Sequence, residues 1–499
     1  MTGEAKRKLK VLYYIPSLGY SHVQFNGKLA ESLIERGHEV HLLMPEVDPS
    51  VGSFNGTTKA AKVFRFPTAG LEAFKNPTLV SNYFDGNYFA FTKGAKQFWL
   101  DMVYIGCKTT VEQIELLNSL KAENYDIGIG EALSYCPFAL FHYLGISPTF
   151  TTTAIPIQTF VTENFGLTHL PSFMPIIGES LINGENLNFL ERIKNLYIRY
   201  CEYSVDSKVY QRETQLFQKH FGHGFPDLKK LLGKVSYAFT NAHPMLSFSK
   251  PITNKVVYLG GGAIPKAKAL TPEFEEIYSK AKKGVVIFSF GSLVNTKRLS
   301  ESKHKAFIDA FKKFSDYEFI WKINSETEEL AKNLITSSNI HLVSWMDQIS
   351  LLSNPKTKAF ITQCGLNSVN EATYTGVPMI AIPLFADQFY NAAVVKHKQI
   401  GVVVNIGSMT SHEVKVALHE VLHNPKYKKS IDVVKRKLEL YPFNPLEEFV
   451  KRVEYAAEFD NLDEFNLASA NLSFLKVYYL DIIGTVLAII GFIYFCLFV

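Results

Sequence analysis

The residues best suited to chemistry in this chain begin with a histidine placed just after a short predicted strand. His22 follows the apolar run Val11–Ile15, at the start of a predicted helix for which Ser21 is the expected N-cap. The partial positive charge at a helix N-terminus disfavours imidazolium, so the ring is expected to stay neutral and able to accept a proton. Such a group at the carboxyl end of a strand is well placed for general base catalysis. The other interpretation is a surface histidine that only hydrogen-bonds to its neighbours.

A carboxylate occupies a comparable position further along the chain. Glu131 follows the predicted strand Asp126–Gly130. A carboxylate on the far nitrogen of His22 would fix its tautomer and stabilise the imidazolium as it forms. Spacing alone does not establish this pair, and a solvated acidic residue is the other interpretation of Glu131.

The stretch 345–391 is the richest in groups that could bind a ligand. A predicted strand, Ala359–Thr362, meets a predicted helix, about Leu366–Thr375, through a Gln-Cys-Gly turn. Such a turn presents free backbone N–H groups with a helix dipole behind them, which makes an anion site. Gly365 would let a phosphate approach the backbone closely.

Polar side chains around this turn fit a ligand with phosphates and hydroxyl groups. Gln363 and Asn367 could add donors to a phosphate, and Glu371, further along the helix, could accept ribose hydroxyls. Three more side chains complete the set. Ser292 lies at the end of the predicted strand Gly284–Ser292, and Asp387 and Gln388 follow the predicted strand Met379–Pro383. Each feature alone is common in α/β folds, whereas the whole ordered string is specific.

Two α/β halves must position these residues. The first is predicted by the strand Val11–Ile15, an amphipathic helix and the strand Val40–Met44, whose right-handed crossover makes the sheet parallel. Helical, aromatic-rich stretches follow around 84–120 and 188–220. A second set of short strands separated by helices is predicted at Gly284–Ser292, Phe319–Ile323, Ile340–Val343, Ala359–Thr362 and Met379–Pro383. Two such halves facing each other leave a cleft between the carboxyl ends of their strands.

Composition excludes several classes of protein. The 499 residues are 47% hydrophobic and 20% charged, as in ordinary globular proteins. The 52 basic and 47 acidic residues give a net charge of only +5, and no long basic run points to a nucleic-acid partner. The widely spaced cysteines have no zinc-site spacing and are expected to be isolated buried thiols rather than disulfides. They are Cys107, Cys136, Cys201, Cys364 and Cys496.

The C-terminal stretch predicts a membrane span. Ile482–Val499 carries no charge, and a helix of that length is about 27 Å long, enough to cross a thin bilayer. Lys476, Tyr478 and Tyr479 precede it, as interface anchors would; a buried core helix is the other interpretation. Met1–Lys10 is polar and basic, and no signal peptide is visible, which taken literally describes a tail-anchored cytosolic protein. The alternative is a lumenal protein whose signal peptide lies upstream.

Taken together, these motifs resemble the animal UDP-glycosyltransferases, the family that includes the UDP-glucuronosyltransferases. Their signature reads approximately W-x-P-Q, L-L-x-H-P, F-I-T-H-x-G, S/G-x-x-E-A, G-V/I-P-M and P-L-x-x-D-Q-x-x-N. This chain matches it at Trp345, Gln348, Leu351-Leu352, Pro355, Phe360-Ile361-Thr362, Gly365, Glu371-Ala372, Gly376-Val377-Pro378-Met379, Pro383-Leu384, Asp387-Gln388 and Asn391. The resemblance extends to Ser21-His22, Arg36–Val40, Gly284–Ser292 and the terminal span.

The resemblance implies a GT-B fold, that is, two Rossmann-like α/β domains facing a cleft, plus one C-terminal transmembrane helix. A cluster of prolines and glycines, Pro244, Pro251 and Gly260-Gly261-Gly262, predicts a domain boundary near 245–260. With the resemblance, the expected parts are an N-terminal acceptor-binding domain over 9–250, a C-terminal UDP-sugar-binding domain over 251–445, a juxtamembrane segment over 446–476 and a membrane helix over 477–499. The implied reaction is inverting transfer of glucose or glucuronic acid from a UDP-sugar to a hydroxyl of a small lipophilic acceptor. UDP-sugar is then a co-substrate, and neither a cofactor nor a metal is expected. The implied location is the endoplasmic reticulum membrane, with the catalytic domains lumenal.

The resemblance also implies roles for individual residues. His22 would be the general base, and Glu131 stands where the family usually has an aspartate partner. The implied UDP-sugar contacts are Trp345 and Gln348 for uracil and ribose, Glu371 for ribose, Ser292, Gln363, Gly365 and Asn367 for the diphosphate, and Asp387 and Gln388 for the sugar.

Three positions depart from the signature. Asp347 replaces its proline, Asn354 replaces the histidine of the His-Pro pair, and Gln363 replaces the histidine that contacts the diphosphate. Glutamine can donate a hydrogen bond but never carries charge, so the third change could cost roughly 10²-fold or more in rate. The alternative function is therefore a membrane-anchored homologue of low or no activity that binds a nucleotide-sugar or a lipophilic ligand.

Overall fold

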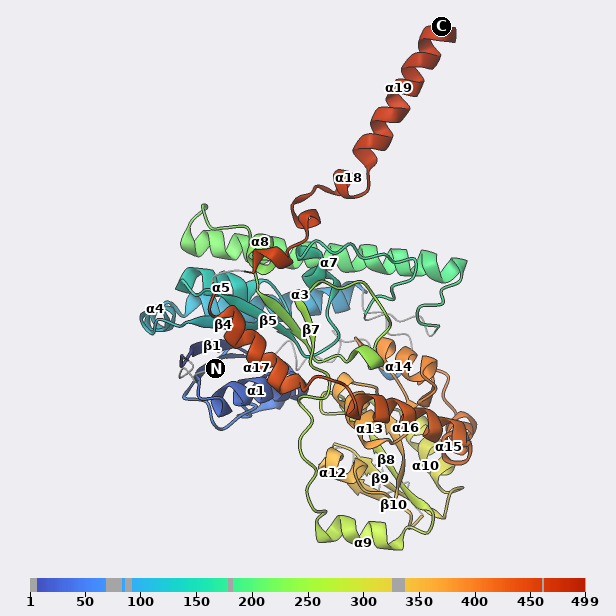
Figure 1. Cartoon of the computed structure of the whole chain (residues 1–499). Coiled ribbons are helices and arrows are strands. Elements are labelled where there is room, and N and C mark those ends of the chain that lie inside the picture. Colours follow the sequence, from blue (N-terminus) through green and yellow to red (C-terminus); the bar gives the residue numbers. More distant parts are fainter. Residues whose placement is uncertain are drawn as a thin grey trace.

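Two parallel β-sheets form the framework of the molecule (Figure 1). The computed structural model describes residues 7–68, 83–85, 92–177, 183–324, 337–459 and 462–498. The first sheet has the strand order β3-β2-β1-β4-β5-β6-β7 and the second has the order β10-β9-β8-β11-β12-β13. Every described pair of neighbouring strands is parallel. The two sheets are those of a GT-B fold, as expected.

The strands of the first sheet are β1 (Lys10–Tyr14), β2 (Glu39–Glu46), β3 (Lys62–Pro67), β4 (Ile127–Glu131), β5 (Thr149–Thr153), β6 (Tyr237–Thr240) and β7 (Val256–Tyr258). Those of the second are β8 (Gly284–Ser289), β9 (Tyr317–Lys322), β10 (Ile340–Val343), β11 (Thr357–Thr362), β12 (Met379–Ala381) and β13 (Gly401–Val403). The strands predicted from apolar runs are confirmed, with boundaries that differ by a few residues.

The helices along the first half are α1 (Tyr20–Glu35), α3 (Lys93–Glu112), α4 (Ile114–Ala122), α5 (Cys136–Leu144), α6 (Thr159–Asn164), α7 (Phe189–Phe221) and α8 (Leu228–Gly233). Those along the second half are α9 (Pro272–Lys280), α10 (Glu301–Phe311), α12 (Gln348–Leu352), α13 (Leu366–Thr375), α14 (Gln388–His397), α15 (Ser411–His423) and α16 (Pro425–Glu439). The chain ends with α17 (Pro445–Ala456), α18 (Phe474–Val477) and α19 (Leu480–Phe498).

Helices cover both faces of each sheet, which explains why the central strands are continuously apolar. In β1, Val11 and Tyr13 belong to the core shared with α1 and α17, while Leu12 and Tyr14 belong to the core under α3, α5 and α7. Helix α17 lies beyond the second half in sequence, yet Phe449 packs edge-on against Phe239 of β6, with ring centroids 4.8 Å apart. The C-terminal segment therefore returns to the first sheet; the predicted domain limits at 250, 445 and 476 stay predictions.

The start of α1 differs from the prediction. Gly19 is the N-cap residue, with a φ of 73°, and Ser21 is already helical. The predicted cap by Ser21 is wrong, because the chain enters the helix through this left-handed glycine and no side chain caps the helix. His22 is the third helical residue, so its expected place at the N-terminus of α1 is confirmed.

The expectation of isolated thiols is wrong for one pair of cysteines. Cys107 of α3 and Cys136 at the start of α5 form a disulfide, with their Cα atoms 5.7 Å apart. Packing of α3 and α5 on the same face of the first sheet brings together residues 29 positions apart, which no local spacing indicates. Cys201 and Cys364 are buried free thiols, as expected.

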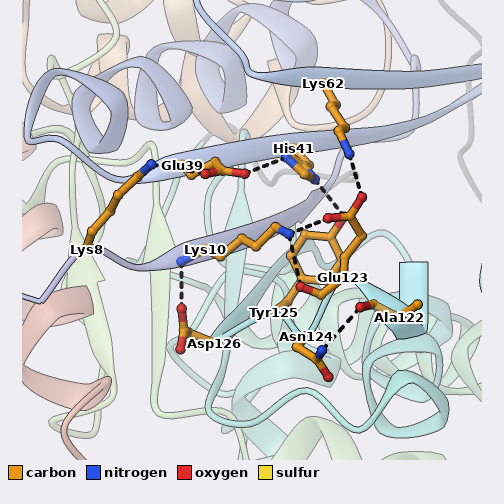
Figure 2. Close-up of polar contacts among 10 residues, drawn as sticks. All are labelled: Lys8, Lys10, Glu39, His41, Lys62, Ala122, Glu123, Asn124, Tyr125 and Asp126. Atoms are coloured by element: carbon orange, nitrogen blue, oxygen red, sulfur yellow. Dashed lines mark hydrogen bonds and ion pairs between the residues drawn. The ribbon is translucent and has the colours of Figure 1, made fainter. Parts of the chain in front are cut away.

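An ionic network joins the amino-terminal ends of β1–β4 (Figure 2). The Glu123 carboxylate pairs with Lys10 and Lys62, and their hydrogen bonds hold its pKa down at about 2. His41 of β2 hydrogen-bonds through Nδ1 to the hydroxyl of Tyr125, at 2.8 Å. This network stabilises the edge of the sheet opposite the carboxyl ends at which His22 and Glu131 lie.

Helix α19 projects from the rest of the molecule (Figure 1). The mean hydropathy over an 18-residue stretch of this helix is 2.3, and none of that stretch is buried against protein. Among the described residues it is the one helix long and apolar enough to cross a membrane. It suggests a single-pass membrane anchor.

Candidate active site in the cleft between the sheets

His22 and Glu131 form a hydrogen-bonded pair at the carboxyl ends of β1 and β4. The distance from His22 Nδ1 to Glu131 Oε1 is 2.6 Å. Because β1 and β4 are neighbours in the sheet, the residues that follow them meet at one edge. With Nδ1 engaged, Nε2 is the ring nitrogen able to take a proton from the cavity that His22 lines.

Further donors hold the Glu131 carboxylate in place. Asn26 Nδ2 donates to Glu131 Oε2 at 3.0 Å, and the backbone N–H of Ala154 donates to Oε1 at 3.2 Å. Asn26 is itself fixed by the hydroxyls of Tyr13 and Thr152, which donate to its Oδ1 at 2.8 and 2.7 Å. Sequence reasoning missed Asn26, although its position one helical turn after His22 places both on one face of α1.

The electrostatics of His22 differ from the sequence-based expectation of a ring kept neutral by the helix N-terminus. Burial disfavours imidazolium, but the charge and hydrogen bond of Glu131, together with the charge of Asp387, raise the pKa of His22 above its usual 6.5. The two carboxylates outweigh burial, so the pKa of the ring is raised and not lowered. The pair is suited to accepting a proton and holding it.

His22 lines a cavity of about 1110 Å³ between the two halves. Residues from the carboxyl ends of both sheets line it. The predicted ligand-binding residues all contribute to its wall: Ser292, Trp345, Gln348, Gln363, Gly365, Asn367, Glu371, Asp387 and Gln388. Glu131 lies behind His22, with a side chain only 1% exposed.

The turn between β11 and α13 has the features of an anion site. Gly365 is the N-cap residue of α13, so the first N–H groups of that helix are free to bind an anion. The Gln363 amide lies between two glycines: a Cβ on Gly291 would lie 2.2 Å from Gln363 Nε2, and one on Gly365 would lie 3.3 Å from it. Glutamine therefore presents an amide where the signature has an imidazole.

A second polar group lies near the middle of α13. Gln348 Nε2 donates to Glu371 Oε2 at 2.7 Å. Burial raises the pKa of Glu371 to about 7, although the hydrogen bond from Gln348 opposes this. Nearby, the Trp345 ring is 58% exposed and carries the Lys322 ammonium 4.5 Å from its centroid. An exposed aromatic face beside a buried carboxyl suits a base joined to a sugar with free hydroxyls.

Two of the residues predicted to contact the ligand already form hydrogen bonds to other groups of the protein. The Asn367 amide accepts from Asn241 at 2.6 Å and donates to Gln24 at 3.4 Å, so it bridges the two halves. Gln388 Oε1 accepts from the backbone N–H groups of Leu384 and Phe385, at 2.9 and 3.1 Å.

Asp387 lies close both to the His22–Glu131 pair and to the predicted ligand-binding residues around the turn between β11 and α13. Asn391 Nδ2 donates to Asp387 Oδ2 at 2.8 Å and also to the carbonyl of Cys364 at 2.9 Å. Burial raises the pKa of Asp387 to about 6, while this hydrogen bond and the charge of His22 lower it. The acid is thereby fixed close enough to His22 to influence its charge.

The first half also contributes large apolar and aromatic side chains to the cavity wall. They include Trp99, Met102, Leu133, Tyr135, Phe160, Val205 and Val209. Glu202 and Asp206, one turn apart on α7, also line the cavity, and burial raises the pKa of Glu202 to about 7. No motif marks these two residues, so sequence reasoning missed them.

Comparisons with known proteins agree with this architecture. The profile of the family described as "UDP-glucoronosyl and UDP-glucosyl transferase" matches residues 10–499. Human UDP-glucuronosyltransferase 2B15 is 28% identical over 488 residues, which cover 95% of this chain and 90% of that protein.

Two solved structures share the fold at 16% identity. The glycotransferase of kitacinnamycin superposes with a TM-score of 0.63, covering 90% of this chain and 100% of that one. Phytolacca americana UGT2, complexed with UDP-2fluoro-glucose and pterostilbene, has a TM-score of 0.60 with the same coverage.

Proposed function

Because the chain belongs to the family of UDP-glucuronosyl and UDP-glucosyl transferases and is a UDP-sugar glycosyltransferase, we propose that it transfers the sugar with inversion to a hydroxyl of a small lipophilic acceptor, with His22 as general base. The observation that carries this proposal is the His22–Glu131 pair at one wall of the cavity whose other wall holds the candidate donor-site residues. The apolar and aromatic side chains that the first half contributes to the cavity wall suit a lipophilic acceptor.

The proposed reaction is a single displacement. Nε2 of His22 removes the proton of the acceptor hydroxyl, and the oxygen attacks the anomeric carbon from the face opposite UDP. The new C–O bond forms as the bond to the diphosphate oxygen breaks, so the product is a β-glycoside and UDP leaves with the electron pair. Glu131 stabilises the imidazolium that holds the proton.

The donor-site roles are part of the same proposal. Trp345 and Gln348 contact uracil and ribose, and Glu371 accepts the ribose hydroxyls. Ser292, Gln363 and the turn at Gly365 hold the diphosphate, together with the free N–H groups at the start of α13. Asp387 and Gln388 contact the sugar. Asn367 supports this wall through its bridge to Asn241.

A second candidate function follows from Gln363. A neutral amide stabilises a leaving diphosphate less than an imidazolium does, so the chain could bind UDP-sugars yet transfer them slowly. Gln363→His distinguishes the two functions: a large gain in kcat with little change in UDP affinity favours the slow enzyme. An unchanged kcat shows that the amide suffices.

UDP binding is expected to depend on the ionisation of Glu371. If ribose hydroxyls donate to its carboxylate, binding favours the ionised form, so affinity rises as pH increases toward its pKa of about 7. The rise is at most about tenfold per pH unit and levels off above that value. Calorimetric titrations with UDP between about pH 6 and 8 measure this change.

Glu371→Gln is the matched control for this titration. It keeps the shape but cannot ionise, so the change with pH due to this group disappears, while the titration of UDP's own phosphate remains. If UDP affinity depends on pH in the same way in the two proteins, Glu371 does not bind the ribose hydroxyls as a carboxylate.

We also propose that the catalytic domains lie in the lumen of the endoplasmic reticulum, with α19 as a single-pass anchor in its membrane. The Cys107–Cys136 disulfide supports this, because disulfides persist in oxidising compartments and are rare in the cytosol. The chain has Asn-x-Ser/Thr sequons at Asn55 and Asn471.

A lumenal protein is expected to be glycosylated at least at Asn55. Removal of N-glycans should then increase its gel mobility, and Asn55→Gln should reduce that shift. In the structure, Asn55 Oδ1 accepts from Arg65 at 2.7 Å, a bond that does not involve Nδ2, the atom to which a glycan is attached. A mobility unaffected by deglycosylation would favour a cytosolic, tail-anchored protein.

A further inference from the structure

We propose that the outward face of the first half of α7 lies on the surface of the membrane that α19 crosses. This face carries large apolar and aromatic side chains that are between 51% and 73% exposed. They are Phe189, Leu190, Ile193, Leu196, Tyr197, Tyr200 and Tyr203. Spacings of three and four residues place them on one side of the helix.

The opposite side of the same turns packs inward. Ile198 and Val205 are buried, and Glu202 and Asp206 line the cavity. The inward face is therefore mixed, with buried apolar side chains and two acids, whereas the face toward solvent carries the large apolar and aromatic side chains. Packing within the protein explains only the first of these, and an exposed apolar patch of this size marks an interaction surface.

The second half of α7 provides an internal comparison. The same outward face continues through Ser207, Gln211 and Gln218, which are polar. The change from aromatic to polar side chains along one continuous helix indicates a partner that covers only the first half.

The position of the anchor identifies that partner as the bilayer. Helix α7 lies on the side of the molecule from which α19 projects (Figure 1). The segment leading to α19 is attached on this side, where Ser469 donates to the carbonyl of Gly166 at 2.6 Å. Exposed apolar side chains continue along it, at Leu472, Phe474, Leu475, Tyr478 and Tyr479. The apolar face of α7 and this segment therefore lie on the same side of the molecule, the side that the anchor brings to the membrane.

The composition of the face suits the interfacial region of a bilayer. Tyrosine rings are enriched at the headgroup level, because one end is apolar and the other is polar. Exposed Arg192 and Lys194 flank the apolar face and can reach lipid phosphates. Helix α7 would then separate the cavity from the bilayer. The inference rests on the anchor α19 and not on the proposed transfer reaction.

Fluorescence quenching by brominated lipid tests this inference on the full chain. The protein is reconstituted into phosphatidylcholine vesicles whose acyl chains are brominated near the glycerol end, and a tryptophan is introduced by Tyr200→Trp. The matched control is Gln211→Trp, on the same face about three turns further along. Both positions are exposed, so neither change disturbs the core, and the unsubstituted chain supplies the background of Trp99, Trp321 and Trp345.

The expected result is a blue-shifted emission from position 200 that is lost in brominated vesicles, with no loss at position 211. Adding Leu196→Glu should restore the emission at position 200, while α19 keeps the chain in the vesicles. Absence of quenching at position 200 would overturn the inference. So would quenching that survives Leu196→Glu, or a blue shift without quenching that grows with protein density, which would indicate a second copy of the chain on this face.

Discussion

Replacing His22 with alanine is expected to lower kcat by roughly 10²–10⁴-fold, the range that a positioned general base contributes. The acceptor hydroxyl would lose the only group that the account assigns to take its proton. The affinity for UDP should stay nearly constant, because His22 is placed at the acceptor and not at the nucleotide. Initial rates of glycoside formation and calorimetric titration with UDP measure the two quantities separately.

The variant should fold, because the His22 side chain is partly exposed to the cavity and because Asn26 and the Ala154 N–H still donate to the buried Glu131. Thermal unfolding of the variant beside the unsubstituted chain controls for this. Retention of the full transfer rate would show that another group, or solvent, takes the proton.

Replacing Glu131 with glutamine is expected to reduce kcat by roughly 10²-fold or more, through the orientation and charge of His22. Glu131 now accepts from His22, Asn26 and the Ala154 N–H. An amide in its place must turn its NH₂ group toward at least one of these donors, which costs about 1–3 kcal/mol. The histidine would lose both its anchor and its counter-charge.

The pH dependence of this variant gives a second, independent readout. In the unsubstituted chain His22 must be neutral to act, so kcat/KM should rise with pH and level off above a pKa that Glu131 raises beyond 6.5. Without that charge the burial of the ring dominates and lowers its pKa. The acidic limb of the Glu131→Gln profile should therefore move to lower pH.

Glu131→Asp is the matched control, since it keeps the charge but shortens the side chain. Its acidic limb should stay close to that of the unsubstituted chain even if kcat falls. An acidic limb at the same pH in all three proteins would mean that His22 is not the group that titrates.

The sequence predicted the strands well because parallel strands buried on both faces read as short apolar runs. It also predicted that His22 and Glu131 follow strands, and parallel pairing of β1 with β4 then brings the two together. What it could not predict is that β4 neighbours β1, because the two strands are separated by more than a hundred residues of chain. The hydrogen-bonded pair became visible only with the strand order.

Features that depend on long-range packing were beyond sequence reasoning. The disulfide between Cys107 and Cys136 needs α3 and α5 on one face of the sheet. The return of α17 to β6 needs a contact between Phe449 and Phe239, which lie in different halves of the chain. The pKa of His22 depends on the balance between burial and two carboxylates, which no spacing encodes.

The part of the cavity wall around the turn between β11 and α13 was predicted more completely because its residues are close in sequence. A strand, a glycine turn and a helix fix the relative positions of Gln363, Gly365 and Glu371 locally. The roles of neighbouring side chains were harder to foresee, as Asn367 shows: it lines the cavity but is bonded across the cleft to Asn241.

The most direct test of the account is stoichiometric transfer by the full chain in membranes. The chain is incubated with UDP-glucose or UDP-glucuronic acid and a mixture of lipophilic alcohols and phenols, and glycosides and free UDP are quantified. We predict that β-glycoside and UDP appear in equal amounts and that both fall sharply in His22→Ala. Tight binding of UDP without glycoside from any acceptor, or equal yields from the two proteins, would contradict it.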